Sequence, residues 1–312
     1  MTGRRRCAAS PWTGSSAIST EALLRAVTDR YGLTEPVVAR RLTGGYANDV
    51  YLLDGATPPV VLHVKYPPID VDSLAWEHRL LGALYPSVRE ALPPLPLLDG
   101  STFFVHDGSP VWLVPFASGG AATADDRVAV AGLLGRLHAV DIEMAPRPGH
   151  PRLCDLPVPP LREYPAAFDP WLRRLAAARS ELIDLVHAID AGRRPASGVT
   201  HNDVFPGNVL VENGQVTAFL DWEEADIDWL VWDLASALWP FCSRDDELDL
   251  AAMAQFLAAY RAAGGRADQV EDDLIVPLIG AKRILEVLRA PTDRDPQWDY
   301  QLTNLRAYEN LR

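Results

Sequence analysis

Cysteine is scarce in this 312-residue sequence, and none of its three cysteines stands in a Cys-x-x-Cys pair. Three widely spaced cysteines (Cys7, Cys154 and Cys242) argue against a disulfide framework or a structural zinc site and fit a reducing compartment. No apolar run reaches membrane-spanning length, and the basic start of the chain is not followed by the apolar segment of a secretory signal. We therefore expect a cytoplasmic protein without a membrane partner, with a disordered tail at residues 1–18.

Positive charge is also in short supply. Lysine and arginine total 29 against 42 aspartates and glutamates, which gives a formal net charge of −13. This balance argues against a broad electropositive surface, so we expect no nucleic-acid partner, whereas a cationic substrate would suit it. Hydrophobic residues make up 48% and charged residues 23%, as in soluble globular proteins, and the length allows two modest lobes.

The first third of the chain predicts a sheet. Short apolar stretches alternate with loops rich in turn residues, as in antiparallel hairpins. The predicted strands are Val37–Leu42, Val50–Leu53, Val60–Lys65, Phe103–Val105 and Val111–Val114, and the predicted helices are Ser19–Tyr31 and Ser73–Leu84. We expect a first lobe over residues 19–117, with a five-stranded antiparallel sheet and one inserted helix.

Beyond residue 117 the hydrophobic pattern becomes mainly helical. The stretch ASGGAA at residues 117–122 marks the expected lobe boundary. The expected fold class is therefore α+β, with a helical second lobe over residues 118–312 that contains the catalytic loop and the acceptor site.

The most informative stretch is THNDVFPGNVLVENGQVTAFLD at residues 200–221. It contains the spacing His-x-Asp-x-x-x-x-Asn, which is the catalytic-loop pattern of kinases. Phosphoryl transfer needs a carboxylate that accepts or orients the acceptor hydroxyl, and oxygen ligands for a magnesium ion. We predict Asp203 as the catalytic carboxylate, with Asn208 and Asp221 as the magnesium ligands. His201 is expected to support the loop structurally.

A hairpin turn at Asn213-Gly214 gives a geometric reason to place Asn208 near Asp221. The pairs predicted by counting outward from the turn are Val211 with Val216, Val209 with Ala218, and Asn208 with Phe219. Period-2 alternation then returns Asp221 to the face of Asn208. Diagonal neighbours on such a face lie roughly 7–8 Å apart, which is close enough to share one metal ion.

Residues suited to bind a nucleotide occur in the predicted first lobe. The loop between its first two strands contains Gly44 and Gly45, followed by Asn48, and glycine lets the backbone approach phosphate. Lys65 ends an apolar strand, and Glu77 lies on the apolar stripe of the next helix. Together they match a strand lysine that holds the α- and β-phosphates and a helix glutamate that holds the lysine. Taken singly, each residue also fits a structural role.

Several segments together resemble the aminoglycoside phosphotransferase family, which includes choline- and homoserine-kinase-like enzymes and shares the protein-kinase fold. The resemblance covers residues 19–311 and rests on LTGGYANDVYLL, VLHVK, VWLVPFASGG, LLGRLHAVD, HNDVFPGNVLV and LDWEEADIDWLVWDLA. It implies two lobes with ATP and Mg²⁺ as cofactors, bound between them. The residues to which it assigns roles are Asp203 (base), Asn208 and Asp221 (magnesium), Lys65 (phosphates) and, through their backbone, Pro115, Phe116 and Ala117 (nucleotide base).

Two positions depart from the family pattern. Asn202 stands where many members have glycine, which leaves the neighbouring Asp203 intact. DIDW at residues 226–229 stands where many have glycine-aspartate-proline, at the expected wall of the acceptor site. The segments HNDVFPGNVL and WDLASALWPFC resemble homoserine kinases of the family somewhat more than its antibiotic kinases.

The acid-rich segment after Asp221 points to the acceptor. Carboxylates and an aromatic ring can hold an ammonium group through ion pairing and cation–π contact. The candidates are Trp222, Glu223, Glu224, Asp226 and Asp228. Surface acids beside a core stripe of tryptophans are the alternative interpretation. We expect a kinase for the hydroxyl of a small, amine-bearing molecule, and the sequence leaves open an antibiotic such as an aminoglycoside, homoserine, choline and an amino sugar.

Two other functions compete with this interpretation. A protein kinase would carry Asp-Phe-Gly after the catalytic loop and then Ala-Pro-Glu, but Trp222 follows Asp221 and no such motif occurs. A catalytically silent nucleotide-binding module would not need Lys65, Glu77 and Asp203 to occur together.

Overall fold

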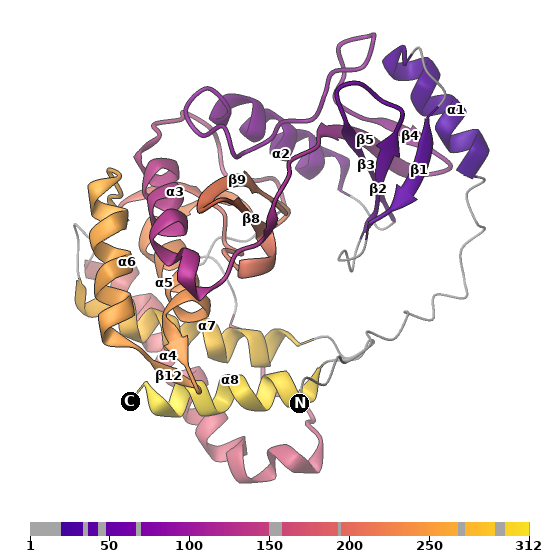
Figure 1. Ribbon diagram of the computed structural model, residues 1–312. Helices are drawn as coiled ribbons and strands as arrows, with labels where there is room; N and C mark the ends of the chain where they lie inside the picture. Colours follow the sequence, from indigo (N-terminus) through magenta and orange to yellow (C-terminus); the bar gives the residue numbers. More distant parts are fainter. Residues whose placement is uncertain are drawn as a thin grey trace, which may run out of the picture. The chain divides into compact units, whose positions relative to one another are not determined.

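The computed structural model describes residues 20–33, 37–42, 48–66, 70–149, 158–192, 195–267, 272–290 and 297–311. The chain forms two compact units, one within Met1–Ile69 and Pro94–Phe116, the other within Asp70–Pro93 and Ala117–Arg312. Figure 1 labels their helices and, where there is room, their strands. The predicted tail and the glycines Gly44 and Gly45 lie outside the described residues.

The first unit contains the predicted five-stranded antiparallel sheet, with the strand order β1-β2-β3-β5-β4. Its elements are α1 (Thr20–Tyr31), β1 (Val38–Arg41), β2 (Asn48–Asp54), β3 (Val60–Lys65), β4 (Phe104–His106) and β5 (Ser109–Pro115). Leu23 and Val27 of α1 share a core with Leu62 and Val64 of β3. Because side chains alternate along a strand, Lys65 at the end of β3 lies on the face opposite to that core.

The second unit is mainly helical, as predicted. Its helices are α2 (Val71–Leu84), α3 (Arg127–Ala139), α4 (Leu172–Gly192), α5 (Leu230–Cys242), α6 (Leu250–Ala262), α7 (Ile275–Arg289) and α8 (Trp298–Asn310). Its short strands are β6 (Gly120–Ala121), β7 (Ser197–Thr200), β8 (Val209–Glu212), β9 (Gln215–Phe219), β10 (Asp226–Trp229), β11 (Ser243–Arg244) and β12 (Glu247–Leu248). None of the helices in the described ranges is long and apolar enough to cross a membrane.

Helix α2 begins two residues before its predicted start because Asp70 caps it. The Asp70 carboxylate accepts hydrogen bonds from the backbone N–H groups of Asp72 and Ser73, at 3.0 and 3.1 Å. The side chains predicted to share the apolar stripe are all buried, namely Leu74, Glu77, Leu81 and Leu84. This helix groups with the second unit by its contacts.

The hairpin of β8 and β9 corrects the predicted register. Asn213 and Gly214 form the turn with φ values of 53° and 75°, and Val211 pairs with Val216 as expected. Beyond that pair the prediction is wrong, because Thr217 forms a bulge that leaves Leu210 opposite Ala218 and Val209 opposite Phe219. The Thr217 hydroxyl donates instead to the carbonyl of Ser118, on the chain that enters β6.

The bulge also removes the counting argument for Asp221. Its φ of 63° lies in the left-handed region, so strand alternation does not continue to this residue. Another contact joins the two segments: the N–H of Leu220 donates to the carbonyl of Asn208 at 2.7 Å. Asp221 therefore follows directly after a residue that is bonded to Asn208.

Candidate active site

The predicted catalytic carboxylate and the first predicted metal ligand are in direct contact. Strand β7 leads into the loop, and a short 3₁₀ turn, Pro206–Asn208, follows it. The Asn208 side-chain N–H₂ donates to Oδ2 of Asp203 at 2.8 Å and to the Asp203 carbonyl at 3.0 Å. The other carboxylate oxygen, Oδ1, has no hydrogen-bond partner among the described residues. The spacing of five residues thus folds the loop back onto Asp203.

The ring of His201 holds the backbone of the catalytic loop in place. Its ring is buried and stacks on Phe219 with centroids 3.9 Å apart. Nδ1 accepts the N–H of Asp203 at 3.3 Å, so Nε2 carries the proton and donates to the Leu220 carbonyl at 2.9 Å. Burial lowers the pKa of His201, which keeps the ring neutral. This geometry agrees with the structural role expected for His201.

Asp233 is a site residue to which the sequence analysis gave no role. Its fully buried carboxylate accepts the backbone N–H groups of His201 and Asn202, both at 2.8 Å. It also receives Nε2 of His138 at 3.0 Å. Burial raises the pKa of the Asp233 carboxyl, but the hydrogen bond and the attraction of His138, with those of His201, outweigh it and lower the pKa overall. The sequence signal that could have pointed to Asp233 is a single acidic residue inside the apolar helical stretch LVWDLASALW.

Asn202 replaces the more usual glycine without loss of the required backbone shape. Its φ is +64°, a region that asparagine tolerates better than most residues. Its side chain donates to the Glu224 carbonyl at 2.9 Å, which ties the loop to the acid-rich segment. Its own carbonyl accepts Nζ of Lys282, on α7, at 3.1 Å. Lys282 is one of only two lysines in the chain.

Arg147 is a second residue that the sequence analysis missed. Its buried guanidinium donates to the carboxylate of Glu77 at 3.0 Å, to the hydroxyl of Ser73 at 2.6 Å and to the carbonyl of Trp222 at 3.0 Å. Its backbone N–H donates to Asp226 at 2.7 Å. Arg147 lies in an irregular segment and contacts residues 70 or more positions away, so no local pattern points to it.

The predicted nucleotide residues fall on both units. Lys65 lies in the first unit and Glu77 in the second, so their pairing stays a prediction. Asn48 begins β2, where its backbone lies opposite Lys65. Pro115 ends β5, and Ala117 begins the second of the two segments that make up the second unit. The N–H of Phe116 donates to the Pro59 carbonyl at 3.1 Å.

The acid-rich segment divides into buried and accessible residues. Trp222 is buried, and its ring N–H donates to the Phe219 carbonyl at 2.7 Å. Asp226 and Asp228 are also buried, and each accepts a backbone N–H bond at 2.7 Å, from Ile227 and Trp229 respectively. Glu223 is half-buried and Glu224 is exposed. The hypothesis of amine recognition therefore narrows to these two glutamates.

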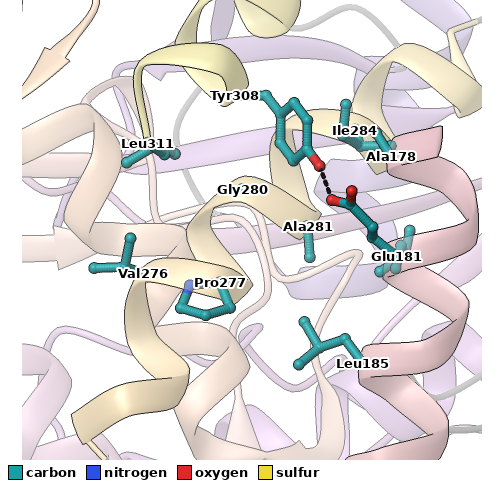
Figure 2. Close-up of a pocket in the computed structure, with 11 residues that line it drawn as sticks. Ala178, Glu181, Leu185, Val276, Pro277, Gly280, Ala281, Ile284, Tyr308 and Leu311 are labelled. Carbon is teal, nitrogen blue, oxygen red and sulfur yellow. Dashed lines mark hydrogen bonds between the residues drawn. The ribbon is translucent and has the colours of Figure 1, made fainter. Parts of the chain in front are cut away.

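A cavity of about 250 Å³ opens among α4, α7 and α8. Figure 2 shows the Tyr308 hydroxyl directed at the Glu181 carboxylate, beside Gly280 and Ile284 of α7. At 100° per residue, Gly280 and Ile284 lie on the side of α7 opposite to Lys282. The cavity is thus separated from the catalytic loop by α7, and we assign it no part in the reaction.

Comparison with known proteins identifies the family of this chain. The sequence profile of the phosphotransferase enzyme family matches residues 38–271. The homoserine kinase of Gluconobacter oxydans is 28% identical over 242 residues, which are 72% of this chain and 72% of that enzyme.

Two solved structures share the fold of this chain. A microcompartment-associated aminopropanol kinase has a TM-score of 0.68 at 15% identity and covers 94% of this chain and 99% of its own. A spectinomycin phosphotransferase in complex with ADP and spectinomycin has a TM-score of 0.64 at 16% identity, with 94% of each chain covered. The fold class is the predicted α+β, protein-kinase-like one, and the chain belongs to the phosphotransferase enzyme family as a small-molecule kinase.

Proposed function

We propose that this kinase transfers the γ-phosphate of ATP to the hydroxyl of a small, amine-bearing acceptor, with Asp203 as the catalytic carboxylate. The observation that carries the proposal is the contact between Asp203 and Asn208, in a loop whose backbone Asp233 and His201 hold. Support for the nucleotide comes from the ADP in the spectinomycin phosphotransferase structure. Homoserine, an alcohol that also carries an amine, is the favoured acceptor because a homoserine kinase is a sequence relative.

Asp203 acts on the acceptor hydroxyl. Because Asn208 occupies Oδ2, the carboxylate presents Oδ1 to the hydroxyl hydrogen. Oδ1 orients the hydroxyl oxygen toward the γ-phosphate and accepts its proton as the new P–O bond forms, while the bond from the γ-phosphorus to the bridging oxygen breaks and ADP leaves. Most of the rate enhancement comes from this positioning. The fixed hydrogen bond to Oδ2 keeps the carboxylate in one orientation.

The residues around Asp203 suit a magnesium ion. Magnesium is bound through oxygen atoms, commonly one or two protein carboxylates together with phosphate oxygens. The Asn208 amide directs its nitrogen to Asp203, so its oxygen points to the other side, and Asp221 is exposed. Asn208 and Asp221 would hold the ion, which when bound neutralises charge on the transferred phosphate. Lys65 is the proposed ligand of the α- and β-phosphates.

Acceptor-dependent release of ADP tests the proposal. The purified protein is incubated with magnesium and ATP, and with homoserine, aminopropanol, choline or an aminoglycoside in turn. We expect ADP release with at least one acceptor, and loss of that release in Asp203→Asn. Absence of acceptor-dependent release across the panel would favour a silent nucleotide-binding module. Transfer of labelled phosphate to generic proteins instead would favour a protein kinase.

A further inference from the structure

The peptide group that joins Asn202 to Asp203 is held on both sides. Its N–H, which belongs to Asp203, donates to Nδ1 of His201 at 3.3 Å. Its carbonyl, which belongs to Asn202, accepts Nζ of Lys282 at 3.1 Å. Because a peptide group is planar, these two bonds together set its orientation. The nitrogen of this group is bonded to the Cα atom of Asp203, so Lys282 on α7 contacts the group that sets the direction of the catalytic side chain.

The backbone of Asn202 relies on charged side chains for its hydrogen bonds. Its φ of +64° lies in the left-handed region, where it belongs to no helix or strand that would supply backbone partners. Its N–H donates to the carboxylate of Asp233 at 2.8 Å. In the described part of the chain, Lys282 supplies the only hydrogen bond to its carbonyl. Removal of Lys282 would therefore leave one side of the catalytic-loop peptide unheld.

The ammonium group of Lys282 lies between the catalytic loop and α5. Its Nζ is 5.7 Å from the ring centroid of Trp232, which is a favourable distance for a cation–π contact. The next residue of α5 is Asp233, which accepts the N–H of Asn202. Consecutive residues of α5 thus support the two polar backbone groups of Asn202, one directly and one through Lys282.

The choice of lysine at this position suits the contact. Lysine and arginine total 29 in the chain, and only two of them are lysines, Lys65 and Lys282. Arginine presents a planar fork that suits two parallel hydrogen bonds, whereas lysine carries a compact ammonium group. A single carbonyl beside an aromatic ring matches the ammonium group better than the fork.

We propose that Lys282 is a positioning residue of the phosphotransfer reaction, whose ammonium group holds the Asn202 carbonyl and thereby keeps the Asp203 carboxylate directed at the acceptor hydroxyl. The inference rests on the proposed kinase function and adds a residue to it. Lys282 acts through the backbone of the loop. A displacement of about 1 Å in a group that positions the reactants can lower a rate by roughly 100-fold.

Rescue by an added amine tests the inference. Lys282→Ala removes three methylene groups and the ammonium group, which together match n-propylammonium. With the fastest of the four acceptors named above, we expect this variant to lower kcat by about 10- to 100-fold and to keep the KM for ATP within about threefold of the wild type. Propylammonium should raise the kcat of the variant several-fold, because it donates N–H bonds and has no hydroxyl to be phosphorylated. Tetramethylammonium, which has the charge but no N–H group, should not.

Two further variants separate positioning from general support of the fold. Arg179→Ala is the matched control, because Arg179 also donates to backbone carbonyls, those of Pro159 and Val158 at 2.6 and 3.0 Å, outside the catalytic loop. Its kcat should stay within about twofold of the wild type and should not respond to propylammonium. Lys282→Arg should keep more of the kcat than Lys282→Ala, since a guanidinium still donates to a carbonyl.

The outcomes distinguish this inference from the kinase function. A kcat of Lys282→Ala within about threefold of the wild type overturns the positioning role and leaves the kinase function standing. So does a loss that propylammonium reverses no better than tetramethylammonium. If the alanine variant does not fold, Lys282→Met, which keeps the length of the side chain, gives the same comparison of kcat. If the wild type releases no ADP with any acceptor, both proposals fail.

Discussion

Two buried charged side chains of the second unit hold neighbouring irregular segments, and they do so with opposite charge. Asp233 accepts the backbone N–H groups of His201 and Asn202. Arg147 donates to the backbone carbonyl of Trp222 and to the carboxylate of Glu77. Buried irregular backbone lacks the regular backbone partners of a helix or sheet, so a charged side chain from elsewhere in the chain supplies the missing partner.

The two clusters differ in their access to water. Asp233 and its partner His138 have no exposed side-chain area. In the other cluster the side chain of Arg147 is 4% exposed and that of Glu77 11%. If a substitution leaves a polar group of the Asp233 cluster without its partner, water cannot replace that partner. Water can reach part of the Arg147 cluster. We therefore expect the Asp233 cluster to contribute more to stability than the Arg147 cluster.

The largest expected effect is that of Asp233→Ala. It leaves the two backbone N–H groups of the catalytic loop and His138 without their acceptor, and should lower the free energy of unfolding by about 3–5 kcal/mol. Urea unfolding followed by circular dichroism measures the change. Asp184→Ala, at an exposed position of α4, is the control and should change stability by less than about 0.5 kcal/mol. A loss from Asp233→Ala no larger than that of the control would refute the role of this cluster.

Arg147→Met should lower the free energy of unfolding by less, about 2–3 kcal/mol. It removes the hydrogen-bond donor of Glu77 and of the Trp222 carbonyl, but water partly reaches this position. Arg147→Lys should recover part of the loss, since lysine keeps the charge but not the planar fork. The same urea experiment gives both values. A loss greater than that of Asp233→Ala would reverse the comparison between the two clusters.

Two histidines, one in each unit, predict how stability changes with pH. Burial and then the charge of Lys65 lower the pKa of His63 to about 4, and burial lowers the pKa of His201. Since the unfolded state binds these protons below about pH 6.5 and the folded state does not, the stability present above that pH is lost as the pH falls toward the folded pKa. In this pH window each histidine contributes up to about 1.4 kcal/mol per pH unit to the loss of the free energy of unfolding.

Urea unfolding at pH 7.5 and pH 5 checks this prediction, with His63→Gln as the matched variant. The wild type should lose stability between the two values, and the variant should lose less because one titrating group has been removed. Equal stability of the wild type at both pH values would contradict the neutral state of the two rings in the folded protein.

The smallest expected effects on stability are those of substitutions in the acid-rich segment after Asp221. They should distinguish an exposed acid, Glu224, from a buried one, Asp228. Glu224→Gln should raise the KM for the acceptor about 10-fold and change the free energy of unfolding by less than about 0.5 kcal/mol. Asp228→Asn should leave that KM in place and lower stability by about 1 kcal/mol, because a neutral amide accepts the buried N–H bond of Trp229 less strongly than the charged carboxylate does. Steady-state kinetics and urea unfolding of both variants give the comparison. An effect of Asp228→Asn on the KM equal to that of Glu224→Gln would restore the original four-acid hypothesis.

Local patterns accounted for what could be predicted from the sequence. The five-stranded sheet and the Asn213-Gly214 turn follow from alternation and turn residues within a few positions. The spacing that singled out Asp203 and Asn208 likewise covers only five positions, and the structure brings the two side chains into contact. Such features depend on interactions between residues that are close together in the sequence.

What the sequence did not reveal depends on distant contacts. The Thr217 bulge forms because its hydroxyl bonds the chain 99 positions away, and this contact shifted the predicted register by one residue. Asp233 joins His138 from 95 positions away. Asp226 was a candidate for binding the acceptor, with a surface acid as the alternative, but it is buried and accepts the backbone N–H of Arg147 from 79 positions away. Composition alone cannot separate a buried, bonded carboxylate from an accessible one.

The turnover of Asp203→Asn tests the central claim most directly. The substitution keeps an oxygen that can accept the Asn208 N–H bond but removes the ability to take the proton of the acceptor hydroxyl. We predict a fall in kcat of about 100-fold or more, with the KM for ATP and the free energy of unfolding close to those of the wild type. Turnover within about threefold of the wild type, in a variant equally stable, would contradict the assignment of Asp203 as the catalytic carboxylate.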